Sequence, residues 1–121
     1  MKWTSKGYEN IICNKNISET TKFCIYGAGK LGGDLYKTLK HYDMFFCFID
    51  NNHSIQEKGY KNEAVISENE YFKKEIKYPV IICASDKNTL LIESDLKNRG
   101  LIHNKNYYIC REFTDKLLPI I

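Results

Sequence analysis

Residues 22–33 read KFCIYGAGKLGG: a short apolar run, a cluster of glycines and the start of an amphipathic segment. The run from Lys22 to Tyr26 is typical of a buried strand that stops at a glycine. From Lys30 to about His41 the leucines recur every four residues, which draws one apolar stripe along a helix. The stretch therefore predicts a strand, a tight turn and a helix in direct succession.

The glycines of this turn have the spacing G-x-G-x-x-G. In such a turn the first glycine permits the sharp bend, the second lets a pyrophosphate approach the backbone, and the third lets the helix lie close to the strand. The free amides and the dipole at the helix start favour an anion. The alternative is that the glycines only build the turn. The predicted phosphate-binding residues are Gly27, Ala28, Gly29, Lys30, Leu31 and Gly32.

Two later stretches agree with a nucleotide site. Asp50 ends a second apolar run, Met44 to Ile49, at 50 − 27 = 23 positions beyond the first glycine. The fingerprint expects an acid about 20 residues on, which accepts hydrogen bonds from ribose hydroxyls. A carboxylate there repels a 2′-phosphate, so NAD is favoured over NADP. Asn51 beside it, and Ser85 after a later apolar run, are predicted at the same edge. The alternative for residues 50–52 is a plain turn.

The rest of the chain alternates apolar runs with helical patterns. Residues 53–63 are polar and contain Gly59, so a loop is expected there. Further strands are expected at 64–66, 80–84 and 106–110.

Two further helices carry sequence signals at their ends. Ser67 and Glu70 match the S-x-x-E capping box, which predicts a helix running to about Lys77, before Pro79. Ser85 or Asp86 is expected to cap the next helix, which ends at Arg99-Gly100.

Strands that alternate with helices, and early strands that are continuous apolar runs, indicate a parallel sheet covered on both faces. Right-handed crossovers favour a doubly wound α/β fold of about five mostly parallel strands in the order 3-2-1-4-5. The expected organisation is a leading segment at 1–21, one domain at 22–112 and an apolar tail at 113–121.

Composition bounds the function classes. The chain has 121 residues, 43% of them hydrophobic, which suits one compact domain. Its longest apolar runs are far short of the roughly 20 residues of a membrane span, and the start lacks the apolar stretch of a secretory signal. A net charge of +3 and a pI near 8.5 fall below the range of nucleic-acid domains. We therefore expect neither a membrane nor a nucleic acid as partner.

The five cysteines form no CxxC pair. Four of them, at positions 24, 47, 83 and 110, lie among apolar residues, which predicts buried thiols in strands. Their spacing fits no zinc motif, so no metal is expected. Free thiols suit a reducing cytoplasm.

Two patterns resemble catalytic pairs. Tyr36 and Lys40 form Y-x-x-x-K, but on the first helix rather than on a later helix that faces a nicotinamide. Cys83 with His103 lacks an evident oxyanion donor or orienting acid. No catalytic residue is therefore predicted.

Together with the glycine turn, the runs Phe48–Asn52, Val65–Ser67 and Val80–Ser85 resemble a Rossmann-like module of surface-polysaccharide and nucleotide-sugar biosynthesis. Similar modules begin sugar-modifying acyltransferases and nucleotide-sugar dehydratases, and end some sugar C-methyltransferases. The likeness covers roughly residues 22–112. It implies that the glycine turn and Asp50 face NAD or the nucleotide of an activated sugar. The relatives carry an attached catalytic domain that this chain lacks, so a complete enzyme is not expected.

The leading hypothesis is a nucleotide-binding or regulatory module of sugar metabolism. A second hypothesis is a ligand-free interaction module, which pairs with itself or with a catalytic chain through Leu117, Leu118, Ile120 and Ile121. A third is a minimal dehydrogenase or epimerase.

Overall fold

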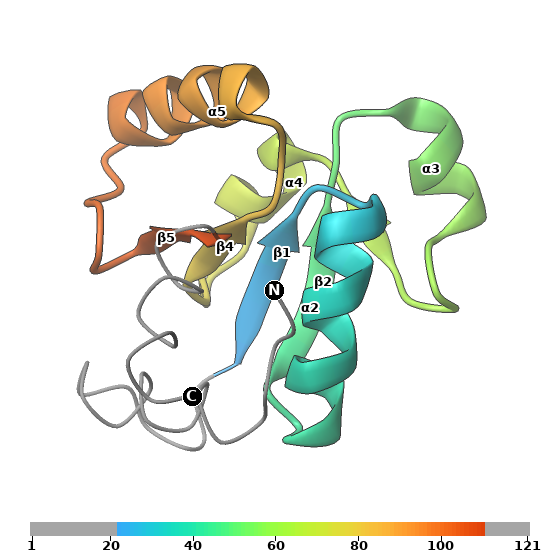
Figure 1. The fold of residues 1–121 in the computed structure, drawn as a ribbon. Coiled ribbons are helices and arrows are strands. Elements are labelled where there is room, and N and C mark those ends of the chain that lie inside the picture. Colours follow the sequence, from blue (N-terminus) through green and yellow to red (C-terminus); the bar gives the residue numbers. More distant parts are fainter. Residues whose placement is uncertain (1–21, 111–121) are drawn as a thin grey trace.

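The fold is described from a computed structural model, which places residues 22–110; the predicted leading segment and apolar tail lie outside this range. Five parallel strands form one sheet in the order β3-β2-β1-β4-β5 (Figure 1). This confirms the predicted order, and the glycine turn follows the central strand. The strands are β1 (Phe23–Tyr26), β2 (Phe45–Ile49), β3 (Val65–Ile66), β4 (Val80–Ile82) and β5 (Tyr107–Ile109).

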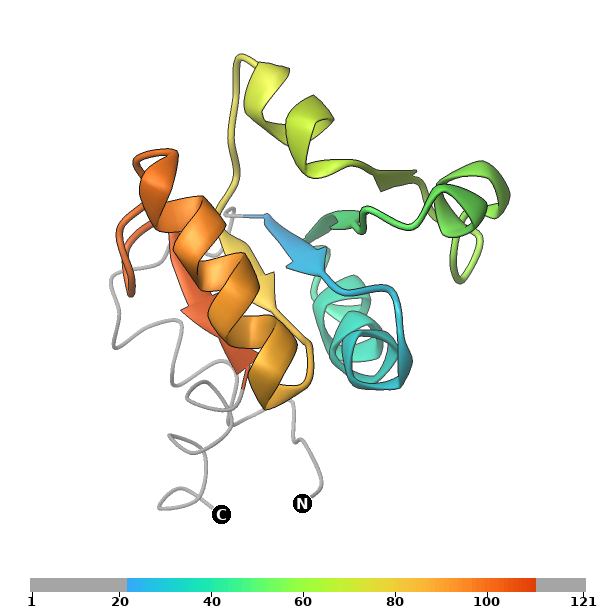
Figure 2. The ribbon, with the colours of Figure 1, turned by 90° about the horizontal axis from the view of Figure 1, so that it is seen from above.

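Helices cover both faces of the sheet, as a doubly wound fold requires. The helices are α2 (Lys30–His41), α3 (His53–Lys58), α4 (Glu68–Lys73) and α5 (Asp86–Asn98). Leu35 and Leu39 of α2 and Ile55 of α3 pack into one core cluster, whereas Tyr71 of α4 and Leu96 of α5 pack into the other. Seen from above, α2 and α4 lie on opposite sides of β1 and β2 (Figure 2).

The central strand supplies both cores. Phe23 and Ile25 point to the α2 face, and Cys24 and Tyr26 point to the α4 face; all four are buried. Because β1 has a strand on each side, its continuous apolar run is what a strand buried on both faces needs.

The four described cysteines are free, buried thiols, as predicted, but only Cys24 and Cys47 lie in strands; Cys83 and Cys110 directly follow β4 and β5. Cys24 and Cys47 are paired across β1 and β2, and their sulfurs lie 3.7 Å apart. Cys13 lies outside the described residues.

The prediction of a loop over residues 53–63 was wrong, because α3 occupies its first half. Asn52 caps this helix: its side-chain oxygen accepts hydrogen bonds from the amides of Ser54 and Ile55, at 3.0 and 3.3 Å. Gly59 ends the helix at a φ of 75°, which favours glycine. With one apolar residue in its length, α3 has no sequence stripe, and its cap and end residues specify it instead.

The helix predicted from Ser67 to about Lys77 is shorter than expected. Ser67 caps it as predicted, since its hydroxyl oxygen accepts a hydrogen bond from the amide of Glu70 at 3.1 Å. The backbone becomes extended at Lys74. Ile76 beyond it is 67% exposed, so a further turn would bury little apolar surface.

The last helix starts and ends at the expected residues. Ser85 caps it, its hydroxyl oxygen accepting a hydrogen bond from the amide of Asn88 at 3.3 Å, and Gly100 follows it with a φ of 94°. Leu96 is fully buried, but Leu90 and Leu91 are more than 60% exposed. The cap and the glycine at its end predicted the helix, whereas neighbouring elements decide which of its leucines are covered.

Candidate functional site

The glycine turn lies between the ends of β2 and β4. Gly27 has a φ of 120°, and its amide donates to the carbonyl of Ile49 at 2.9 Å. A Cβ atom at Gly27 would lie 2.2 Å from the carbonyl oxygen of Cys83, just after β4. Both the backbone conformation and the close neighbour therefore require glycine here. This is the sharp bend that the sequence predicted for the first glycine.

The other two glycines face different surroundings. A Cβ at Gly32 would lie 2.1 Å from the carbonyl oxygen of Gly27, so this glycine lets α2 approach the turn closely. A Cβ at Gly29 would meet no atom of residues 22–110 within 4 Å, and the backbone there is extended, with φ −136°. Packing does not explain Gly29. The open space beside it is the room that a phosphate needs to reach the backbone.

The first turn of α2 presents backbone donors that no side chain of residues 22–110 caps. Gly29 is the N-cap residue and makes no side-chain capping hydrogen bond. Its carbonyl accepts the amide of Gly33 at 2.8 Å, which starts the helical pattern. The amides of residues 30–32 are the unpaired donors of such a helix start, and the dipole adds positive potential.

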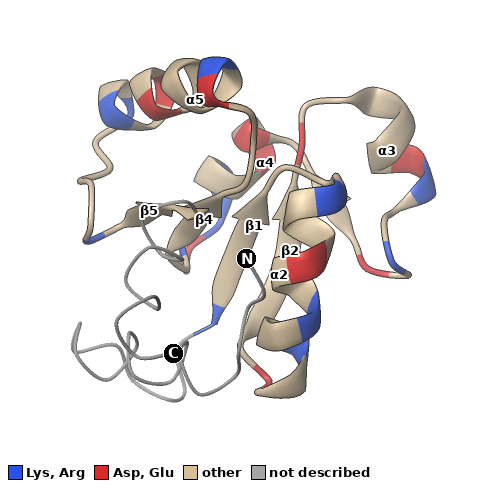
Figure 3. Cartoon of the chain, viewed as in Figure 1, with Lys and Arg blue, Asp and Glu red and all other residues tan. Residues whose placement is uncertain are grey.

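The side chains of this first turn leave it open. Lys30 is exposed and Leu31 is 41% exposed, so the first leucine of the predicted stripe does not enter the core. Basic and acidic residues are interspersed along α2 and α5 (Figure 3). A lysine at the helix start places a cation next to the free amides.

The carboxylate of Asp50 points at the glycine turn. Its Oδ2 accepts a hydrogen bond from the amide of Ala28 at 3.0 Å, and its Oδ1 accepts one from the amide of Asn52 at 2.9 Å. The side chain is half-buried. The acid that the sequence placed 23 residues after Gly27 therefore lies against the turn in space. Each carboxylate oxygen keeps a lone pair for a further donor.

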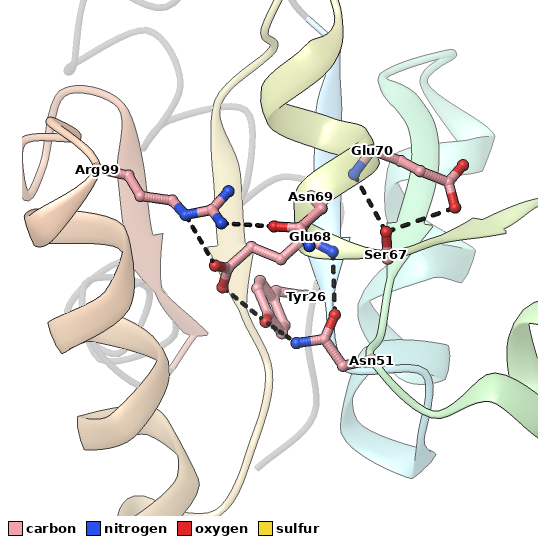
Figure 4. Close-up of polar contacts among 7 residues, drawn as sticks. All are labelled: Tyr26, Asn51, Ser67, Glu68, Asn69, Glu70 and Arg99. Atoms are coloured by element: carbon pink, nitrogen blue, oxygen red, sulfur yellow. Dashed lines mark hydrogen bonds and ion pairs between the residues drawn. The ribbon is translucent and has the colours of Figure 1, made fainter.

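Asn51 is held by the protein itself. Its side-chain nitrogen donates to the hydroxyl of Tyr26 at 3.3 Å, and its side-chain oxygen accepts the amide of Glu68 at 3.0 Å (Figure 4). Both polar ends of the side chain thus link the end of β2 to β1 and α4. In this arrangement Asn51 fixes the loop that carries Asp50.

The same network contains a buried carboxylate that the sequence analysis did not single out. Glu68 is 7% exposed; one oxygen accepts the hydroxyl of Tyr26 at 2.9 Å, and the other lies 3.4 Å from the guanidinium of Arg99 (Figure 4). Arg99 also donates to the side chain of Asn69. The network therefore joins β1, α4 and the end of α5. The sequence signal for this network was Tyr26, because its hydroxyl is a polar group on an otherwise apolar strand.

This network makes the free energy of unfolding depend on pH in the alkaline range. Burial, and the hydrogen bond to Glu68, raise the pKa of Tyr26 well above its usual value. Its contribution to stability is therefore complete below about pH 10 and is lost as the pH rises towards the folded-state pKa. We expect the unfolding free energy to fall above about pH 10. The decline should be shallower in Tyr26→Phe, and urea midpoints measured at several pH values for both proteins check this. Parallel curves for the two proteins would contradict it.

Ser85 lies at the end of β4, next to β1 in the sheet, and is exposed. Its hydroxyl caps α5, and Cys83, two residues before it, borders Gly27. The structure thus brings the ends of β1, β2 and β4 together at one edge. Among the described residues no hydrogen bond joins Ser85 to Asp50; the two residues reach this edge from different strands, β4 and β2.

The structure shows what surrounds the two patterns that resemble catalytic pairs. The Tyr36 hydroxyl donates to Glu63 at 2.7 Å, and the Lys40 ammonium lies 2.9 Å from the same carboxylate. The hydrogen bond to Glu63 raises the pKa of Tyr36, the opposite of what a catalytic tyrosine needs. Burial raises the pKa of the Cys83 thiol, which disfavours the nucleophilic thiolate.

Within residues 22–110, no group of three or more His, Cys, Asp or Glu side chains is arranged to hold a metal ion. None of the helices in that range is both long and apolar enough to cross a lipid bilayer. No protein-family model matches the chain, and neither a curated protein nor a solved structure matches it.

Proposed function

We propose that this protein binds a nucleotide, NAD(H) or a nucleotide-sugar, with its diphosphate on the first turn of α2. The observation that carries the proposal is the position of Asp50, whose carboxylate lies 3.0 Å from the amide of Ala28. An acid against the glycine turn is placed to accept ribose hydroxyls while the diphosphate occupies the adjacent helix start.

The surroundings of the turn support the same ligand. Gly29 borders open space, and the amides that follow it have no side-chain cap. The amide of Ala28 is already occupied by Asp50, so the donors left for a phosphate are those of the helix start, next to Lys30. The negative charge of Asp50 opposes a 2′-phosphate, so NAD is favoured over NADP.

The role that fits is binding or regulation in sugar or surface-polysaccharide metabolism, in line with the motif likeness of residues 22–112. The chemistry of a partner chain then acts on the bound nucleotide, and no catalytic residue of this chain is assigned. The free, buried thiols suit a reducing cytoplasm.

Calorimetric titration of the full chain tests the proposal. NAD⁺, NADP⁺ and uridine-diphosphate glucose serve as probes. We expect NAD⁺ or uridine-diphosphate glucose, which carry no 2′-phosphate, to bind, and Asp50→Asn to weaken that binding by about 10-fold or more. Gly29→Val should abolish binding without unfolding the chain, since a Cβ there would meet no atom of residues 22–110 within 4 Å.

Asp34→Asn is the matched control, because Asp34 is an exposed acid on the same helix as the phosphate site. It should bind like the unmodified chain. If no probe binds, or if Asp50→Asn and Asp34→Asn behave alike, the proposal is wrong.

A second candidate is a protein–protein interaction module. The adjacent leucines Leu90 and Leu91 of α5 favour it, because both are more than 60% exposed. The apolar tail on which this hypothesis first rested lies outside the described residues. Light scattering over a range of concentrations tests self-pairing, since a strict monomer would exclude it.

A further inference from the structure

Tyr60 lies in a tight hairpin turn between α3 and β3. The backbones of Tyr60 and Glu63 exchange two hydrogen bonds, at 3.1 and 2.9 Å. Between them, Lys61 and Asn62 have φ values of 54° and 63°, the pattern of a type I′ turn. The turn is therefore a closed unit that holds the backbone of Tyr60 in one place.

This turn is fastened to α2 through Glu63. The carboxylate of Glu63 accepts the hydroxyl of Tyr36 and pairs with the ammonium of Lys40. The ring of Tyr60 packs edge-on against Phe48, with ring centroids 5.1 Å apart. Tyr60 is thus fixed at its backbone by the turn and at its ring by the core.

The far end of the Tyr60 side chain reaches the glycine turn. Its hydroxyl donates to the carbonyl of Gly29 at 3.0 Å. Gly33 makes room for it, since a Cβ there would lie 2.9 Å from the Tyr60 oxygen. The glycine that extends the G-x-G-x-x-G pattern therefore has a partner, a side chain 27 positions further along the chain.

The geometry of the peptide unit gives this contact a consequence. The carbonyl of Gly29 and the amide of Lys30 belong to one planar, trans peptide group, so they point in opposite directions. Two donors, the amide of Gly33 and the hydroxyl of Tyr60, hold the carbonyl. The amide of Lys30 is therefore held pointing out of the helix start. Hydrogen bonds to the carbonyl also strengthen the amide as a donor.

We propose that Tyr60 is a positioning residue, which fixes the Gly29–Lys30 peptide so that the amide of Lys30 is preorganised to bind a phosphate of the nucleotide. This inference rests on the proposed function and adds to it a residue outside the glycine turn and the strand ends. Preorganisation raises affinity by reducing the ordering cost of binding.

Tyr60→Phe tests the inference, because it removes the hydroxyl and keeps the ring that packs on Phe48. Tyr36→Phe is the matched control: it removes a tyrosine hydroxyl from the same region, while Lys40 still holds Glu63. The first measurement needs no ligand. In Tyr60→Phe, the carbonyl ¹³C resonance of Gly29 and the amide ¹⁵N resonance of Lys30 should move, and in Tyr36→Phe both should stay near their original positions.

The second measurement is the dissociation constant of the nucleotide that the unmodified chain binds in the calorimetric series. Tyr60→Phe should weaken binding on the order of fivefold, the effect of one neutral hydrogen bond, and Tyr36→Phe should leave it unchanged. Unmoved resonances, or equal effects of the two variants on affinity, would overturn the role of Tyr60 alone. Failure of the unmodified chain to bind any probe would overturn the proposed function, and this inference with it.

Discussion

Replacing Gly32 with alanine should cost about 3 kcal/mol or more of unfolding free energy. The added Cβ would lie 2.1 Å from the carbonyl oxygen of Gly27 and 3.1 Å from a methyl group of Ile25. The first of these atoms belongs to the backbone of the glycine turn, so no side-chain rotation relieves the clash. Either α2 moves away from β1 or the turn opens, and both change the core of the fold.

Urea unfolding followed by circular dichroism measures this loss, and Gly29→Ala is its matched control. Both glycines belong to the same motif, but a Cβ at Gly29 meets no atom of the described part of the chain within 4 Å, and its φ of −136° suits any residue. We expect the control to stay within about 0.5 kcal/mol of the original stability. Equal effects of the two substitutions would mean that the close approach of α2 to the turn is wrong.

Replacing Glu68 with alanine should cost about 3 kcal/mol, the second large effect. Glu68 is buried, and its removal leaves the hydroxyl of Tyr26 without its acceptor and the guanidinium of Arg99 without its ion pair. Because Arg99 is partly exposed, water offsets part of its loss, which places the effect at the lower end for a broken buried pair.

Glu70→Ala is the control for this substitution, since Glu70 lies on the same helix but is exposed and is hydrogen-bonded to the cap residue Ser67. It should cost less than about 1 kcal/mol. Thermal or urea unfolding of both variants measures the two losses of stability. If Glu68→Ala costs no more than Glu70→Ala, the buried network adds no net stability at this edge of the sheet.

The sequence was sufficient to predict the sheet, because the signals for its strands and for the helix and turn beside them are local. Each central strand is a continuous apolar run, the helix from Lys30 to His41 has a regular leucine stripe, and the glycines mark the turn between strand and helix. Given right-handed crossovers, these elements allow few strand orders. The order 3-2-1-4-5 followed, and the structure confirms it.

The predictions for two helices were wrong because tertiary contacts or capping residues, rather than the periodicity of apolar residues, decide where those helices lie. The helix α3 has one apolar residue, Ile55, and depends on its Asn52 cap and on Gly59. The helix α4 stops at Lys73, where a further turn would place Ile76, which is exposed, and would bury little apolar surface. A pattern of apolar residues cannot register either cause.

The residues of the candidate site also fall into two groups: those that sequence spacing predicts, and those that depend on contacts between distant elements. The spacing from Gly27 predicted Asp50, and its carboxylate lies against the turn. The direction of the Asn51 side chain depends on Tyr26 and Glu68, which come from other elements. The contact between Tyr60 and Gly29 spans 31 positions, and a tyrosine in a polar stretch gives no sign of it.

The central claim is that a nucleotide diphosphate binds the backbone amides at the start of α2. An amide-detected NMR titration of the full chain with NAD⁺, and then with uridine-diphosphate glucose, tests it most directly. The account predicts that the amide resonances of residues 29–32 and of Asp50 shift most, and that they saturate with added ligand. If saturating amounts of both ligands leave these resonances in place, no nucleotide of either class binds at this turn.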